Sequence, residues 1–384
     1  MSYVGNRGVW EISGDSGNLG LVQLNAISAA GLAKSGLNPT NPIDAYTLEA
    51  PFSTATVNGA TARGFTVPYT TFPTSKSLDQ ALRPYPQYAS IYSEYSPTGK
   101  SWYDSLHIKV TKRLSHGLQL LEAFTYNKEL DEGQDTERGR GSQINDALNR
   151  ASNKFLSAED TPFISATSFT YELPYLLPRG YMKERVLARK LFGGWTIAGL
   201  ARYANGGLIR IPGSNVGTNC NGTTGCSSIN ISNLLQRGTF ANYVPGQAKF
   251  LVDPNCHSCI AHSANNLPGT NPGFLNPAAW AEPSLGVFST TAPYLNNYRW
   301  QRQPQENLNI GKKFGTPIRG HEDANLQIRA EFTNVFNRTF LPQPSSGTFE
   351  TPVTTANSGF GRVNVGGLGN TTYRTGQIVA RFTF

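Results

Sequence analysis

The four cysteines are the residues best suited to covalent or metal chemistry in this sequence, and all lie between positions 212 and 304. They form two close pairs, Cys220 with Cys226 and Cys256 with Cys259. An even number of cysteines in an exported protein favours disulfide bonds that restrain a loop with no core of its own. We expect Cys220 to pair with Cys226, although sequence spacing alone leaves other connectivities open.

A metal site is the alternative use of the same cysteines. Cys256 and Cys259 form a CxxC motif, and His257 and His262 could add imidazole ligands of the kind that bind zinc. A second ligand pair at a recognised spacing is missing from the sequence, so we favour disulfides and expect neither metal nor cofactor. Haem attachment needs a histidine directly after the second cysteine, where this chain has Ile260.

Clustered carboxylates are the remaining candidates for chemistry. One polar stretch contains, in order, Glu129, Asp131, Glu132, Asp135, Glu137, Arg138 and Arg140. Paired carboxylates can do acid–base work, but nothing in the pattern places them against a pocket, and mixed charge runs usually face water. The HExxH and GxSxG motifs and a spaced Ser/His/Asp set do not occur. We therefore expect no catalytic residues and no enzymatic activity.

The positive charge of the chain does not indicate a nucleic-acid partner. The net charge is +8, but the basic residues are scattered, with a single cluster in residues 179–190. A nucleic-acid binding protein would concentrate them in a stripe or in a recognisable binding module. We expect no nucleic-acid binding.

Composition favours many short strands joined by turns. Glycine occurs 39 times and proline 24 times, and only 15% of the residues are charged. No run of about 18 apolar residues, the length that a membrane-spanning helix requires, is present. A membrane-spanning β-barrel stays compatible with this composition, because only every second residue of its strands faces lipid.

The clearest strand pattern runs from Ala324 to Phe336, thirteen residues in which apolar and polar side chains alternate. This length is sufficient for the about 9 to 11 residues that a tilted strand needs to cross a bilayer. The polar face includes Gln327, Arg329 and Glu331, which we expect to face the lumen of a barrel.

The end of the chain repeats this alternation. Ile378, Ala380, Phe382 and Phe384 form an apolar face, which predicts a closing strand over residues 377–384. Weaker strands are predicted over residues 102–113, 118–130, 162–173, 195–211 and 305–314, and residues 1–10 end an eighth strand. Within 118–130, Glu122 falls on the apolar face, which indicates a bulge there or a wrong face assignment.

The connections between the predicted strands differ systematically in length. Residues 114–117 and 315–323 are short and 174–194 is intermediate, whereas the long connections are 11–101, 131–161, 212–304 and 337–373. Bacterial outer-membrane barrels have short periplasmic turns, long extracellular loops and a periplasmic C-terminus. We therefore predict an all-β, antiparallel transmembrane β-barrel in the cell outer membrane, with every long loop outside. Eight strands are few for such loops, so the chain is expected to form part of a larger barrel.

An ordered set of motifs resembles the TonB-dependent outer-membrane receptors, and most closely their Oar-like branch. The set consists of YVGNRG (Tyr3–Gly8), RPYPQY (Arg83–Tyr88), SWYDSLHIKVTKRLSHGL (Ser101–Leu118), FTYNKELD (Phe124–Asp131), YELP (Tyr171–Pro174), GGW (Gly193–Trp195), NPAAW (Asn276–Trp280), RAEFTNVFNRTF (Arg329–Phe340) and FGRV (Phe360–Val363). The motifs span nearly the whole chain.

The resemblance implies a barrel of about 22 strands, of which this chain supplies roughly the last third. It also implies a signal peptide, a TonB-contacting segment and a plug domain upstream; the first residues do not have the pattern of a signal peptide. The terminal strand, ending at Phe384, resembles the signal that the barrel assembly machinery reads. Expected partners are this machinery, outer-membrane lipid, the TonB energy-transducing complex and an unidentified solute ligand.

The function that these observations predict is binding and import of that solute. One alternative is an outer-membrane surface adhesion or interaction protein without transport activity, built on the same strands. A second alternative is a soluble, secreted β protein that never enters a bilayer.

Overall fold

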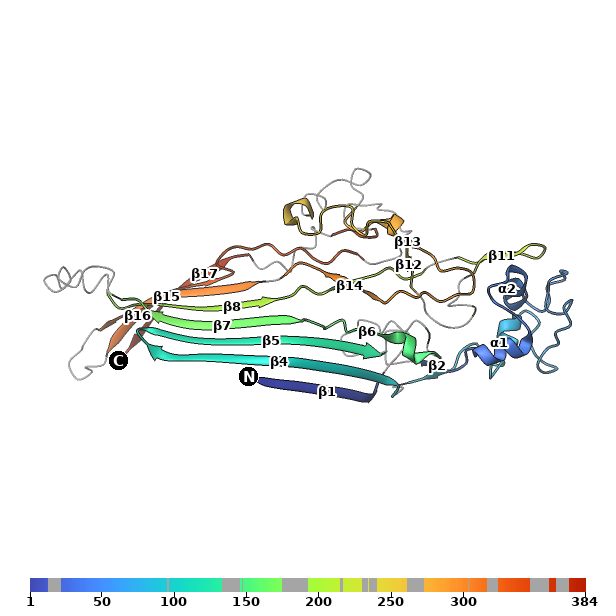
Figure 1. Cartoon of the computed structure of the whole chain (residues 1–384), viewed down its shortest axis with the longest axis horizontal. Coiled ribbons are helices and arrows are strands. Elements are labelled where there is room, and N and C mark those ends of the chain that lie inside the picture. The colour runs from blue at the N-terminus through green and yellow to red at the C-terminus, as the bar shows by residue number, and fades with distance from the viewer. Residues whose placement is uncertain are drawn as a thin grey trace.

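An elongated antiparallel sheet dominates the computed structural model, with its strands along the long axis of the molecule (Figure 1). Helices α1 and α2 lie beyond one end of the sheet, and the C-terminus lies near the other (Figure 1). The structure describes residues 1–12, 22–94, 97–132, 146, 148–174, 193–214, 217–229, 234, 240–260, 273–302, 304–315, 324–345, 359–363 and 373–384.

The sheet confirms the predicted all-β, antiparallel fold class. Its eight main strands are, in spatial order, β1 (Ser2–Glu11), β4 (Gly99–Ser115), β5 (Leu118–Glu132), β7 (Phe163–Glu172), β8 (Trp195–Ala204), β15 (Gln305–Gly315), β16 (Asn325–Thr333) and β17 (Thr375–Thr383). The short β6 (Lys154–Leu156) pairs with the end of β5. In the described part of the chain, the outermost strands β1 and β17 pair with no second neighbour, so the sheet stays open.

A two-residue turn defines one end of the sheet, which we call the turn end. His116 and Gly117 connect β4 to β5, and both have positive φ angles, 52° and 77°. Two left-handed residues in succession are typical of a hairpin turn that matches the twist of its strands. A Cβ atom at Gly117 would lie 2.6 Å from the carbonyl oxygen of Glu172, so the turn also requires glycine for packing. The opposite end, which carries the long connections, is the loop end.

The paired register places apolar side chains on one face of the C-terminal strands. Ile328 pairs with Ala380 and Phe332 with Gly376, which lie on the same face as Phe382. Ile328 and Phe382 are both exposed. An exposed apolar sheet face is the surface that a barrel presents to lipid.

Strand β16 is shorter than its alternation predicts. The pattern extends over thirteen residues to Phe336, whereas the strand has nine and ends at Thr333. Asn334 adopts a left-handed conformation with φ 51°, and its side-chain Oδ1 accepts a hydrogen bond of 2.8 Å from the Arg338 N–H. Asparagine tolerates this conformation and hydrogen-bonds its local backbone, so it turns the chain although the hydrophobic period continues.

The expected bulge or change of face at Glu122 is wrong. The pairing of β5 with β4 and β7 continues without a shift through this residue. Its carboxylate stays on the apolar face and accepts hydrogen bonds from the hydroxyls of Ser165, at 2.7 Å, and Thr167 on β7. A charged group in an apolar setting is tolerated when its oxygens are hydrogen-bonded.

The expectation that the long connections are loops without a core is wrong. At the loop end they contain hydrophobic cores of their own. The first cluster unites α1 (Ala29–Ser35), α2 (Pro42–Glu49), α3 (Leu78–Ala81) and the hairpin of β10 (Asn219–Asn221) and β11 (Gly225–Ser228). Leu48, Leu78 and Leu234 are fully buried in it. Close to this cluster in sequence, β2 (Val22–Gln23) pairs with β3 (Tyr92–Ser93).

The second cluster lies against the continuation of β8 and β15 beyond the sheet. Its elements are β9 (Leu208–Arg210), β12 (Asn242–Tyr243), η2 (Pro277–Ala279), β13 (Trp280–Ala281) and β14 (Tyr294–Arg299). Ile209, Phe274 and Phe360 are buried in its core. The remaining short helix, η1 (Arg150–Asn153), precedes β6. None of the helices in the described ranges is long and apolar enough to cross a membrane.

A matched pair of substitutions on β16 tests which face of the sheet meets lipid. We expect Ile328→Arg to lower the free energy of unfolding by about 2–4 kcal/mol, because a cation near the middle of the lipid face loses its hydration. Gln327→Arg, one residue away on the polar face, is expected to cost less than about 1 kcal/mol. Denaturant unfolding of both variants in lipid vesicles measures the difference. Equal costs, or the reverse order, would contradict this face assignment.

Candidate functional site

A cavity of about 630 Å³ lies across strands β7, β8, β15, β16 and β17. Three neighbouring rows of residues from these strands line it, and the middle row, which belongs to the apolar face, consists of Phe169, Gly199, Leu308, Phe332 and Gly376. The two outer rows belong to the polar face of the sheet. One row consists of Thr170, Ala198, Asn309, Glu331 and Gln377, and the other of Ser168, Leu200, Asn307, Thr333 and Thr375. We call the cavity the polar trough.

The predicted lumen-facing residues differ in their relation to the trough. Glu331 lines it, and its carboxylate accepts a hydrogen bond of 2.6 Å from the Gln377 side-chain amide. Arg329 lies one row toward the turn end and forms an ion pair with Glu331, with 2.6 Å between Nε and Oε1. Gln327 lies one row further, between Lys313 and Arg381 in the register. The three share a face, and only Glu331 belongs to the trough.

Sequence reasoning named residues of β16 and missed their counterparts on the neighbouring strands. Asn307 and Asn309 on β15, and Ser168 and Thr170 on β7, bring amide and hydroxyl groups into the same trough. The signal was present as polar residues at alternate positions in both segments. It was not decisive, because the side chains meet only when the register of three strand pairs is known.

The residues expected to carry the barrel-assembly signal lie on or beside the edge strand β17. Ile378 and Phe384 are 80% and 79% exposed, and the rings of Phe382 and Phe384 stack at 5.9 Å between centroids. Ala380 lies between them on the same face, paired with Ile328. These apolar side chains do not line the trough and are accessible at the edge of the sheet.

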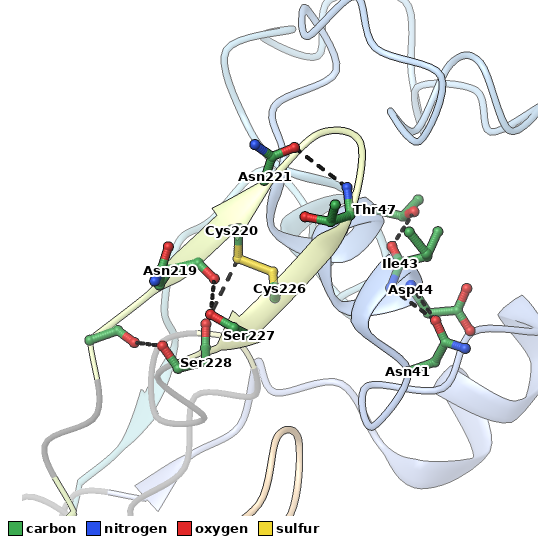
Figure 2. The surroundings of a disulfide bond; sticks show 12 residues. Asn41, Ile43, Asp44, Thr47, Asn219, Cys220, Asn221, Cys226, Ser227 and Ser228 are labelled. Atoms are coloured by element: carbon green, nitrogen blue, oxygen red, sulfur yellow. Dashed lines mark hydrogen bonds between the residues drawn. A yellow bond between two sulfur atoms is a disulfide. The ribbon is translucent and has the colours of Figure 1, made fainter.

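The cysteines form two local disulfides in the loop-end clusters, Cys220–Cys226 and Cys256–Cys259. Cys220–Cys226 closes the β10–β11 hairpin, which lies beside α2 (Figure 2). The Asn58 side-chain amide donates to the Gly222 carbonyl at 2.8 Å, which ties the hairpin tip to the first cluster. A Cβ atom at Gly225 would lie 2.4 Å from the Pro42 carbonyl carbon, so only glycine permits this packing.

The other candidate groups do not converge on a reactive centre. His257 hydrogen-bonds through Nε2 to the Thr339 carbonyl oxygen at 3.2 Å, and His262 lies outside the described residues. Within the described ranges, no three His, Cys, Asp or Glu side chains gather as metal ligands. Glu132 has Lys100 and Arg150 as ionic partners, each at 3.8 Å. Of the same acidic stretch, positions 135 and 137, like the arginines at 138 and 140, lie outside the described residues.

Comparison with known protein families decides the classification. The model of the outer membrane beta barrel domain matches residues 1–377. The chain belongs to this family. As an outer membrane β-barrel protein it is located in the cell outer membrane, where the exposed apolar face of its strands meets lipid. No curated protein and no solved structure matches the chain.

One carboxyl group in the first cluster of this outer membrane β-barrel protein has a strongly shifted pKa. Burial, reinforced by the charge of Asp79, raises the pKa of Glu49 from 4.5 to about 7, although Arg83 opposes the shift. Burial raises the pKa of Asp79 as well, against the effect of its ion pair with Arg83. Both shifts arise because a cluster with little access to water disfavours the charged carboxylate.

The first cluster should lose stability as the pH rises from about 4.5 to about 7. Across this window Glu49 ionises in the unfolded chain but keeps its proton in the folded one, so ionisation favours unfolding. We expect Glu49→Gln to weaken the pH dependence in this window and to stabilise α2 above pH 7. Hydrogen-exchange protection factors of the α2 amides measure this. Glu94→Gln, at an exposed carboxylate, is the control, and an unchanged pH dependence in Glu49→Gln would contradict the assignment.

Proposed function

We propose that this chain forms the C-terminal part of the barrel of a TonB-dependent receptor of the Oar-like branch, which binds a solute outside the cell and imports it. The observation that carries this proposal is the polar trough in a sheet whose strands have one polar face and one exposed apolar face. Polar side chains from β7, β15, β16 and β17 would line the path of a solute through the barrel.

The open edges of the sheet support a larger barrel. In lipid, unpaired backbone N–H and C=O groups cost several kcal/mol each, so a barrel wall must be closed. Strands β1 and β17 each pair on one side only in the described chain. Further strands on both edges, as in a barrel of about 22 strands, would satisfy them.

The orientation of the proposed barrel follows from its two ends. Short turns lie in the periplasm and long loops outside in bacterial barrels, so the turn end would be periplasmic and the two clusters extracellular. The clusters would bind the solute, and the trough would receive it. The resemblance supplies the remaining parts: energy from the TonB complex, a plug upstream and recognition of the strand ending at Phe384 by the barrel assembly machinery.

A surface adhesion or interaction protein is the second candidate function. The loop-end clusters favour it, because they have buried cores and two disulfides and could present a stable surface to a partner. Adhesion needs no trough and no energy supply, so the two functions differ in a measurable way.

Uptake by intact cells separates these functions. Cells expressing the complete gene should deplete at least one solute from a defined mixture, and removal of TonB should abolish the depletion. Glu331→Ala is expected to slow this uptake at least several-fold, because the variant removes the anionic group and the hydrogen bonds that it accepts in the trough. Mass spectrometry of the medium measures the depletion.

A carboxylate outside the trough provides the control for the uptake experiment. Glu94→Ala removes an exposed carboxylate outside the trough and should leave uptake unchanged. Uptake that continues without TonB would indicate a passive channel. Cell-surface binding without any depletion would favour the adhesion protein.

A further inference from the structure

A second cavity, of about 660 Å³, lies at the loop end where β8 and β15 leave the sheet. Residues on both sides of the β8–β15 connection line it, together with residues that follow β16. Its lining contains Arg299, Arg302 and Arg338 and the side chain of His257, but no aspartate or glutamate. Three arginines that line one cavity make it a candidate site for an anion.

Two of these arginines are held by carboxylates outside the lining. Arg338 Nε donates to both carboxylate oxygens of Glu306, at 3.0 Å and 2.9 Å. Arg299 pairs with the buried Asp160 and also donates to its backbone carbonyl, at 2.5 Å. These pairs balance the charge of both guanidinium groups and restrict their position.

The third arginine differs from them. Arg302 is exposed, and within the described part of the chain its guanidinium has neither an ion pair nor a hydrogen bond. It therefore places an uncompensated positive charge and five N–H donors at the cavity. A planar donor fork of this kind matches the oxygens of a carboxylate or a phosphate.

The walls of the cavity are fixed by hydrogen bonds. Trp300 is buried and donates from its indole N–H to the Leu341 carbonyl at 2.8 Å. The Tyr298 hydroxyl donates to the Pro254 carbonyl at 2.5 Å. His257 stands in the turn closed by the Cys256–Cys259 disulfide and bonds to the Thr339 carbonyl oxygen. A site that is already ordered loses little conformational entropy when a ligand binds.

We propose that this cavity binds an anionic group, a carboxylate or a phosphate, of the solute that reaches the barrel, with Arg302 as its principal contact. That the ligand is a solute to be imported rests on the proposed function, whereas the cavity and its charge do not depend on import. In this site the Cys256–Cys259 disulfide restrains His257 in the wall of the cavity.

Isothermal titration of the protein expressed from the complete gene, purified in detergent, tests this inference with citrate and inorganic phosphate as probes. We expect Arg302→Gln to weaken binding about ten-fold or more, which corresponds to the loss of one charge-assisted hydrogen bond. Arg302→Lys should bind with intermediate affinity, because it keeps the charge and loses the donor fork. High salt should weaken wild-type binding.

Arg113→Gln is the matched control, since it removes one exposed arginine at the turn end, and it should bind both probes like the wild type. Binding of citrate alone would identify a carboxylate site, and binding of phosphate alone a phosphate site. Failure of both probes to bind, or equal binding by Arg302→Gln and the wild type, would overturn the inference. If neither probe binds while TonB-dependent uptake persists, only this inference is wrong; if a probe binds without uptake, only the proposed transport is.

Discussion

Backbone hydrogen bonds between antiparallel strands place the functional side chains of this protein, and in lipid no water is present to replace those bonds. The pairing of β7, β8, β15, β16 and β17 brings Thr170, Asn309, Glu331 and Gln377 into one row. A shift of one residue in any of these pairs would move its polar side chains to the lipid face. The hydrogen-bonded register of the strands therefore determines both which side chains face lipid and which line the trough.

Where the strands leave the sheet, burial of apolar side chains away from water stabilises the two clusters. The segment from 212 to 304 contributes to both clusters, because its hairpin packs on α2 while its later residues surround Phe274. Leu341 and Phe360, from the connection between β16 and β17, enter the second cluster as well. Two connections that are far apart in sequence are thus held together at the loop end, next to the cavity that contains Arg302.

The strands could be predicted from sequence because each has its own alternation of apolar and polar residues. The period of two in residues 305–314 and 377–384 is close to the observed β15 and β17. Local hydrogen bonding limited this reasoning at Asn334, where a left-handed turn ends β16 although the apolar alternation continues to Phe336. At Glu122, hydroxyl groups from the neighbouring strand stabilise a carboxylate that the pattern alone made anomalous.

The sequence by itself determined the strand segments, the antiparallel barrel class and the polar face of β16, because hydrophobic period and turn residues are local properties of the chain. The tertiary structure alone decided which strands contribute to the trough, how the two clusters form and which arginine keeps a free charge. These features depend on contacts between residues far apart in the chain, such as Arg299 with Asp160 and Arg338 with Glu306. No local pattern specifies such partners, because strand register and the packing of the clusters bring them together.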